Sequence, residues 1–251
     1  MKQNKSPLKS HPSELKIHVR LNKFLSNSGL CSRREADTLI KMGLVQINGK
    51  IITEMGYQIK PTDEVKYDGA RIEPSPPVYL LLNKPKGFIS TYQKGKIKKL
   101  VQELIPYGLK KKILPVEDMG RSMKGLIVLT NDQSLIKKLN NSKAIPMVYQ
   151  VLLDQNITKE IIDKLKAGKI INNKTQKVKV ISYLQGKSKN EIGVEVNSLN
   201  PTSLDKLFEI VGLNVIQMDR IAYGSLTKKD LPRGKWRKLS NKEIGFLKMM
   251  S

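Results

Sequence analysis

Cysteine and histidine are scarce in this sequence. Cys31 is the one cysteine among 251 residues, so a disulfide cannot form within the chain and a reducing compartment is expected. The two histidines, His11 and His18, lie near the N-terminus and, together with Cys31, are too few and too poorly spaced for a zinc site. Because neither histidine lies in the larger part of the chain, a Ser-His-Asp triad is also disfavoured. We expect a cytoplasmic protein that uses no metal or other cofactor.

Long apolar runs and aromatic residues are also scarce. No apolar run reaches the roughly 18 residues that a membrane-spanning helix needs, and residues 1–12 lack the apolar stretch of a secretory signal. Aromatic residues make up 5% of the chain, whereas membrane-surface helices oppose aromatic side chains to a basic face. We therefore expect no membrane association. A phosphate-binding G-x-x-x-x-G-K-[ST] loop is also missing from the sequence.

Positive charge is what the sequence has in excess. Lysine and arginine total 46 against 22 aspartate and glutamate residues, which gives a formal net charge of +24 and a pI near 10.0. A field of this sign attracts polyanions, and nucleic acid is the partner that it favours. The same charge disfavours self-association, so a monomer is expected. The hydrophobic fraction of 39% is sufficient for a folded core.

Proline-rich composition divides the chain. Residues 71–77 contain three prolines, which neither a helix interior nor a central strand tolerates, so they are interpreted as a linker. This predicts a flexible basic tail at 1–17, a small domain at 18–70, a larger domain at 78–244 and a polar tail at 245–251.

The small domain has clear local signals. Apolar residues at helical spacing predict a first helix that ends at Gly29. Ser32, with Glu35 in the capping-box position, predicts the start of a second helix, and Gly43 its end. Val45-Gln-Ile47 alternates like a strand, and the Asn48-Gly49 pair that follows predicts a hairpin turn.

Two arginines in this domain point to an anionic ligand. Arg33 and Arg34 lie in the first turn of the predicted second helix, where cations oppose the helix dipole unless an anion docks there. The alternative is that both are solvated. Neighbouring basic residues favour phosphate binding, and the predicted RNA-binding set is Arg20, Lys23, Arg33, Arg34, Lys41, Asn48 and Lys50.

Residues 20–25, 29–37 and 43–49 together resemble the S-four-type RNA-binding domain. The rest of the chain is similar to the RsuA/RluB group of ribosomal RNA pseudouridine synthases, through residues 78–87, 125–132, 148–151, 208–212 and 226–239. The resemblance implies an α+β protein: a small S-four-type RNA-binding domain followed by a pseudouridine-synthase-like domain with a mixed, mostly antiparallel sheet. It also implies ribosomal RNA or a ribosomal subunit as the partner.

The catalytic motif of that family is altered here. The family carries its aspartate in a loop of pattern G-R-L-D-x-x-[ST]-x-G-L, and an ungapped match through Pro115-Val116 and Gly125-Leu126 places that aspartate at Gly120. Glycine has no side chain to attack carbon or abstract a proton. A shifted register would let Asp118 take the role. The resemblance also implies that an arginine pairing with the aspartate maps to Asp205, and that Tyr149 is the base-stacking tyrosine, although a core role for Tyr149 is the alternative.

These departures predict a catalytically inactive family member that binds ribosomal RNA, as a ribosome-associated or ribosome-biogenesis factor. The alternative is an active pseudouridine synthase with a relocated carboxylate, most readily Asp118. A third hypothesis is a general polyanion binder without a defined site.

Overall fold

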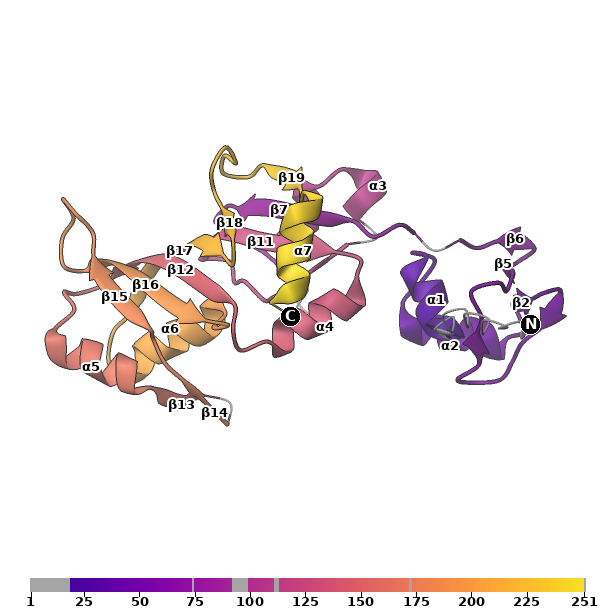
Figure 1. Cartoon of the computed structure of the whole chain (residues 1–251), viewed down its shortest axis with the longest axis horizontal. Helices are drawn as coiled ribbons and strands as arrows, with labels where there is room; N and C mark the ends of the chain where they lie inside the picture. The colour runs from indigo at the N-terminus through magenta and orange to yellow at the C-terminus, as the bar shows by residue number, and fades with distance from the viewer. Residues whose placement is uncertain (1–18, 74, 92–98, 111–112, 172, 251) are drawn as a thin grey trace, which may run out of the picture. The chain divides into compact units, whose positions relative to one another are not determined.

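The computed structural model describes residues 19–73, 75–91, 99–110, 113–171 and 173–250 (Figure 1). The tail expected at 1–17 lies outside the described residues. The chain separates into two compact units, Met1–Pro76 and Pro77–Ser251, and each is described by itself. No helix in these described ranges is long and apolar enough to cross a membrane.

The smaller unit packs two helices on short strands. Its core contains Leu21 and Leu25 of the first helix, Ala36 and Ile40 of the second, and Val45 of a strand. The elements are α1 (Leu21–Asn27), α2 (Arg33–Lys41), a pair formed by β1 (Val19–Arg20) and β4 (Gln58–Ile59), and a sheet in the order β3 (Lys50–Ile51), β2 (Val45–Ile47), β5 (Val65–Tyr67) and β6 (Ala70–Arg71).

The local signals of this unit are confirmed. The Ser32 hydroxyl accepts from the Glu35 amide at 3.2 Å, and the Glu35 carboxylate accepts from the Ser32 amide at 2.7 Å, which completes the capping box. Asn48 and Gly49 adopt φ values of 49° and 81°, the left-handed geometry that a two-residue hairpin turn requires.

The larger unit is built on a mixed, mostly antiparallel sheet. Nine of its described strands form this sheet. The order across it is β15 (Val180–Tyr183), β16 (Glu191–Asn197), β12 (Pro146–Leu153), β17 (Val215–Tyr223), β11 (Lys124–Thr130), β7 (Tyr79–Lys84) and β19 (Trp236–Lys238), with β10 (Leu114–Pro115) beside β11 and β18 (Leu226–Thr227) beside β17. Two smaller pairs are β8 (Phe88–Ile89) with β9 (Lys99–Leu100), and β13 (Lys169–Ile171) with β14 (Lys174–Gln176).

Helices cover this sheet in two groups. In Figure 1, α4 and α7 lie beside the β7–β11 half, and α5 and α6 lie beside the β12–β16 half. The helices of the larger unit are a 3₁₀ turn η1 (Val101–Leu104), α3 (Tyr107–Lys110), α4 (Gln133–Asn141), α5 (Lys159–Ala167), α6 (Pro201–Ile210) and α7 (Asn241–Met249). All four long helices contribute leucines to one buried cluster.

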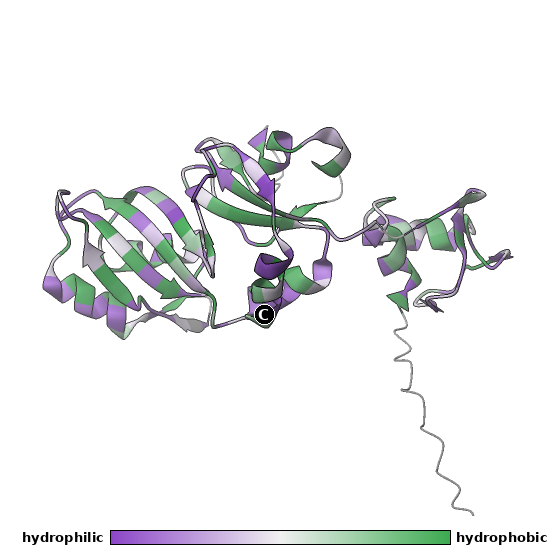
Figure 2. Ribbon diagram, turned by 45° about the horizontal axis from the view of Figure 1, so that its top comes forward, coloured by the Kyte–Doolittle hydropathy of each residue, from purple (hydrophilic) through white to green (hydrophobic). Residues whose placement is uncertain are grey.

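Strands β7 and β11 are buried on both faces. Leu81 and Val128 point into the main cluster, whereas Leu82 and Ile127 point into a second cluster on the opposite face. Continuous apolar strands are typical of positions covered on both sides. Figure 2 shows the apolar colour along these central strands, while the strands nearer the β15 edge alternate with polar residues.

The two halves of the sheet join through one short parallel contact. β11 pairs with β17 only at Lys124↔Asp219 and Gly125↔Arg220. A Cβ on Gly125 would lie 2.3 Å from the Arg220 carbonyl oxygen and 2.4 Å from its nitrogen, and the φ of Gly125 is +111°. Glycine is therefore what lets the two backbones approach at this junction.

The C-terminal segment differs from the expected tail. Residues 241–249 form α7, whose N-terminus has a capping box between Ser240 and Glu243, and whose Leu247 is fully buried. The polar composition of this segment obscured its amphipathic character, because Leu247 is its one fully buried side chain and Ile244 packs against the same core only partly buried.

Candidate active site

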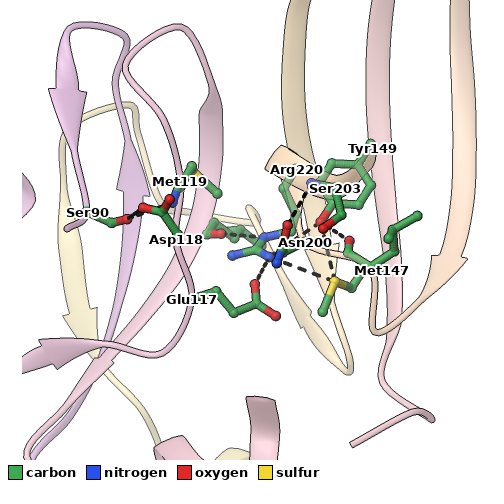
Figure 3. A network of polar contacts seen from close by, with 11 residues as sticks. Ser90, Glu117, Asp118, Met119, Met147, Tyr149, Asn200, Ser203 and Arg220 are labelled. Carbon is green, nitrogen blue, oxygen red and sulfur yellow. Dashed lines mark hydrogen bonds and ion pairs between the residues drawn. The ribbon is translucent and has the colours of Figure 1, made fainter. Parts of the chain in front are cut away.

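A buried ion pair occupies the junction between the two halves of the sheet. Arg220 of β17 is 1% exposed and forms an ion pair with Glu117, which lies in the loop between β10 and β11 (Figure 3). The Arg220 Nε also donates to the Leu126 carbonyl at 2.7 Å. Burial lowers the pKa of Arg220, but attraction to the Glu117 carboxylate outweighs it, so the net shift is upward and the guanidinium stays charged.

Two tyrosines surround the guanidinium. The Tyr149 hydroxyl donates to the Leu199 carbonyl at 2.9 Å and lies 3.5 Å from the Arg220 Nη1. The Arg220 guanidinium carbon lies 4.8 Å from the centre of the Tyr223 ring, a cation–π distance. Burial raises the pKa of both tyrosines. Carboxylate, guanidinium and neutral phenol are thus gathered at one point of the sheet.

Asp118 points away from this cluster. Its carboxylate accepts a hydrogen bond from the Ser90 hydroxyl at 3.0 Å, and the same Ser90 oxygen accepts from the Met119 amide at 2.6 Å. Figure 3 shows Asp118 directed to Ser90, while Glu117 is directed to Arg220. The consecutive carboxylates therefore have different neighbours.

Lys84 fixes the loop that carries both carboxylates. This lysine ends β7 and is fully buried, and its ammonium group donates to the Gly120 carbonyl at 2.8 Å and to the Met123 carbonyl at 2.6 Å. Burial lowers the pKa of Lys84 to about 8, against the opposing attraction of Asp118. Lys84 therefore has a structural use, because it satisfies two loop carbonyls.

The lowered pKa of Lys84 predicts a pH-dependent stability. From about pH 8 to 10.5 the unfolded chain holds a proton that the folded chain has lost, so the free energy of unfolding rises with pH in this window. Relative to Lys84→Met, the wild type should gain on the order of 2 kcal/mol between pH 7 and pH 10. Urea unfolding of both proteins at the two pH values measures this gain. A difference that does not change with pH would contradict it.

A cavity opens beside the carboxylates. Its volume is about 390 Å³, and its walls come from the loop before β11, the end of α4 and the segment that leads into α6. The polar lining residues are Thr91, Glu117, Asp118, Asn140, Ser198 and Asn200. Asn200 also caps α6, because its side-chain oxygen accepts from the Ser203 amide at 2.8 Å. The cavity thus combines two carboxylates with neutral hydrogen-bonding groups.

A second ion cluster surrounds Asp219, the residue that precedes Arg220 on β17. The Asp219 carboxylate, on a side chain that is 11% exposed, accepts hydrogen bonds from Lys228 and Arg233. Burial raises the pKa of Asp219, but these two donors outweigh it, and the net direction is downward. Arg233 also donates to the Asn83 side chain at 2.8 Å, which ties β17 to β7.

The residues that the sequence analysis singled out differ in their burial and in their distance from the ion pair. Gly120 is half-buried, and a Cβ there would meet only the Met123 sulfur at 3.6 Å. Tyr149 is fully buried in the main core. Asp205 is half-buried on α6, where burial and then Glu209 raise its pKa. The structure brings Tyr149 close to the ion pair and gives Asp118 a separate partner.

The predicted RNA-binding residues lie in the smaller unit. Arg33 and Arg34 are exposed in the first turn of α2. Arg20, Lys41 and Lys50 are also exposed, and Lys23 is half-buried. Asn48 has an internal use, because its side chain donates to Asp63 at 3.0 Å and accepts from the Glu64 amide at 2.9 Å. Its contribution to RNA binding stays a prediction.

Arg220 and Glu117 are the site residues that sequence reasoning overlooked. Neither of them was assigned a role from the sequence. One signal was available, since an arginine at the centre of a strand pattern needs a buried anion. Of the described residues, no group of three or more His, Cys, Asp or Glu side chains could hold a metal ion.

Comparisons with known proteins agree with this architecture, in which a small unit of helices and short strands precedes a mixed sheet with a buried cluster of Glu117, Arg220 and Tyr149. The S4 domain model matches residues 19–65, and the RNA pseudouridylate synthase model matches residues 78–206. The chain therefore belongs to the RNA pseudouridylate synthase family.

Its relatives cover nearly the whole chain. The chain is 32% identical to ribosomal large subunit pseudouridine synthase B of Bacillus subtilis over 92% of its own length and 96% of that protein. It is 34% identical to the dual-specificity RNA pseudouridine synthase RluF of Escherichia coli K12, over 90% of its own length and 77% of that protein. A crystal structure of a pseudouridylate synthase shares the fold, with a TM-score of 0.64, 22% identity and coverage of 91% and 99% of the two chains.

Proposed function

We propose that this protein is a ribosomal RNA pseudouridine synthase in which Glu117 supplies the carboxylate at the reacting nucleotide. The relatives named above are pseudouridine synthases, and two of their names specify the ribosomal large subunit or RNA as the substrate. Large-subunit ribosomal RNA is therefore the substrate that we assign. The non-catalytic reading predicted from Gly120 is the second candidate.

The observation that carries the proposal is the Glu117–Arg220 ion pair beside Tyr149. A carboxylate, its arginine and a tyrosine are together although the aspartate position is Gly120. Glu117 lies three positions before Gly120, and its longer side chain reaches the guanidinium from that earlier position. Glu117 also lines the cavity, although only 8% of its side chain is exposed, so one carboxylate both borders the cavity and contacts the buried cation.

The chemistry that this arrangement supports is an isomerisation. The target uridine leaves its stack and enters the cavity. The N1–C1′ bond breaks, the uracil rotates, and C5 bonds to C1′. The C5 hydrogen then leaves as a proton, and N1 gains one, so atoms and electrons balance without a cofactor. The Glu117 carboxylate would act as nucleophile at the sugar or as the base for the departing proton.

The second candidate is an RNA-binding protein without the reaction. Gly120 favours it, because the position at which the family pattern places its aspartate has no side chain. Asp205 favours it too, since a cation is expected there from the resemblance. In this case the ion pair of Glu117 and Arg220 would serve only to join β17 to the β10–β11 loop.

One assay separates the two candidates. The purified full chain is incubated with large-subunit ribosomal RNA that carries tritium at C5 of uracil, because isomerisation releases that hydrogen to water. We expect stoichiometric release from one site, with pseudouridine located by chemical labelling of the RNA. Binding of the RNA without release of tritium would contradict the proposed enzymatic activity and support the function of an RNA-binding protein.

A further inference from the structure

A second, larger cavity lies next to the candidate active site. Its volume is about 910 Å³, and it is formed by the end of α4, the end of α5 and the segment from β14 to β15. Its lining is polar, with several asparagine side chains among the described residues. Four lysines contribute to it: Lys143, Lys166, Lys177 and Lys179.

The charge of this cavity has one sign. None of the described residues that line it is acidic. All four lysines are exposed, and none forms an ion pair with a carboxylate in the described part of the chain. Other lysines of the same unit do pair, since Lys164 contacts Glu160 at 2.6 Å and Lys187 contacts Glu191 at 3.3 Å. Four lysines that line one cavity without a carboxylate create a positive field that attracts an anion.

The lysine-lined cavity adjoins the cavity of the candidate active site. Asn140 and Ser198 line both cavities. Ser198 is held in a left-handed conformation, with φ of 47°, and its hydroxyl accepts from the Ile145 amide at 2.9 Å. A chain molecule that occupies the carboxylate-containing cavity with one unit could therefore continue past these two residues toward the lysines.

We infer that the lysine-lined cavity binds the phosphodiester backbone of the single-stranded RNA that flanks the target nucleotide. This inference rests on the proposed RNA substrate and adds a binding site in the larger unit, separate from the arginines of α2. Amide and hydroxyl groups between the lysines suit ribose hydroxyls and bases. Unpaired, exposed ammonium groups suit phosphates, because they bind as point charges without a fixed geometry.

A four-lysine variant tests the inference against a matched control. The test protein carries Lys143→Gln, Lys166→Gln, Lys177→Gln and Lys179→Gln. The control carries Lys159→Gln, Lys164→Gln, Lys187→Gln and Lys189→Gln, which are exposed lysines of the same unit that do not line the cavity. Both full-length proteins lose the same net charge, so any general attraction to RNA falls equally.

Binding of a fluorescent oligouridylate of roughly 16 nucleotides, long enough for a typical single-strand site, is measured across a range of salt concentrations. We expect the test variant to bind roughly tenfold or more weakly than the control, with a salt slope smaller by about 3, at ~0.7 per lost phosphate contact. Equal affinities and slopes for the two variants would overturn the inference. This measurement needs no pseudouridine formation, so it can succeed or fail independently of the catalytic proposal.

Discussion

Replacing Glu117 with glutamine should reduce pseudouridine formation roughly a thousandfold, within the range that one positioned acid–base or nucleophilic group contributes. Glutamine keeps the shape and a hydrogen bond to Arg220 but can neither attack C1′ nor accept the C5 proton. Single-turnover tritium release at saturating RNA measures the loss. RNA affinity should stay within about twofold, because Glu117 is almost completely buried, with 8% of its side chain exposed.

Asp118→Asn is the matched control. Asp118 is the neighbouring carboxylate on the same cavity, but its partner is Ser90, so its loss should cost far less activity than that of Glu117. The opposite ranking would transfer the catalytic role to Asp118.

Removing Glu117 also leaves a buried arginine unpaired, which can cost about 3–5 kcal/mol of stability. The double variant Glu117→Gln/Arg220→Met removes both charges and should fold. If that protein is folded and fully active, the ion pair has only a structural role and the catalytic assignment of Glu117 is wrong.

Gly125→Ala should destabilise the larger unit by about 4 kcal/mol, the sum of overpacking and a left-handed backbone strain. The new methyl group would overlap the Arg220 backbone, which belongs to a different strand and has no free rotation with which to escape. Thermal unfolding should shift down by about 10 °C, and activity should fall because Arg220 moves with its strand.

Gly120→Ala gives the comparison for this effect. It adds the same methyl group five residues earlier, in the loop that precedes β11, where the nearest contact is an ordinary 3.6 Å to a methionine sulfur. The midpoint of thermal unfolding of this variant should lie within about 2 °C of that of the wild type. Equal shifts for the two alanine variants would show that the close approach of β11 and β17 is not what requires glycine.

Much of the fold could be predicted from local signals. The capping box at Ser32, the Asn48-Gly49 turn and the strand at Val45 depend on neighbouring residues, and the structure confirms them. The prediction of a mixed, mostly antiparallel sheet came from the family resemblance. Local signals could not supply it, because strand order depends on contacts between distant segments. The helix at the C-terminus was missed, since its burial through Leu247 depends on packing that the segment itself does not reveal.

The site was only partly predictable. Aligning a loop to a motif identifies which side chain has been lost, as at Gly120, but not which neighbour reaches the vacated region. Glu117 and Arg220 are separated by about a hundred residues, and their pairing depends on a two-residue parallel contact between β11 and β17. The direction of Asp118 toward Ser90 depends likewise on the way in which the loop folds back on β8.

Strand β17 carries adjacent side chains of opposite charge toward two separate sets of partners. A slip of one residue would turn a carboxylate toward Glu117 and a guanidinium toward Lys228 and Arg233. Each misalignment would bring like charges together in a poorly solvated interior, in place of the three ion pairs that the native alignment forms. The alternation of charge on β17 therefore favours the native register over a register shifted by one residue. Only in the native register do Asp219 and Arg220 both form ion pairs where the two halves of the sheet join.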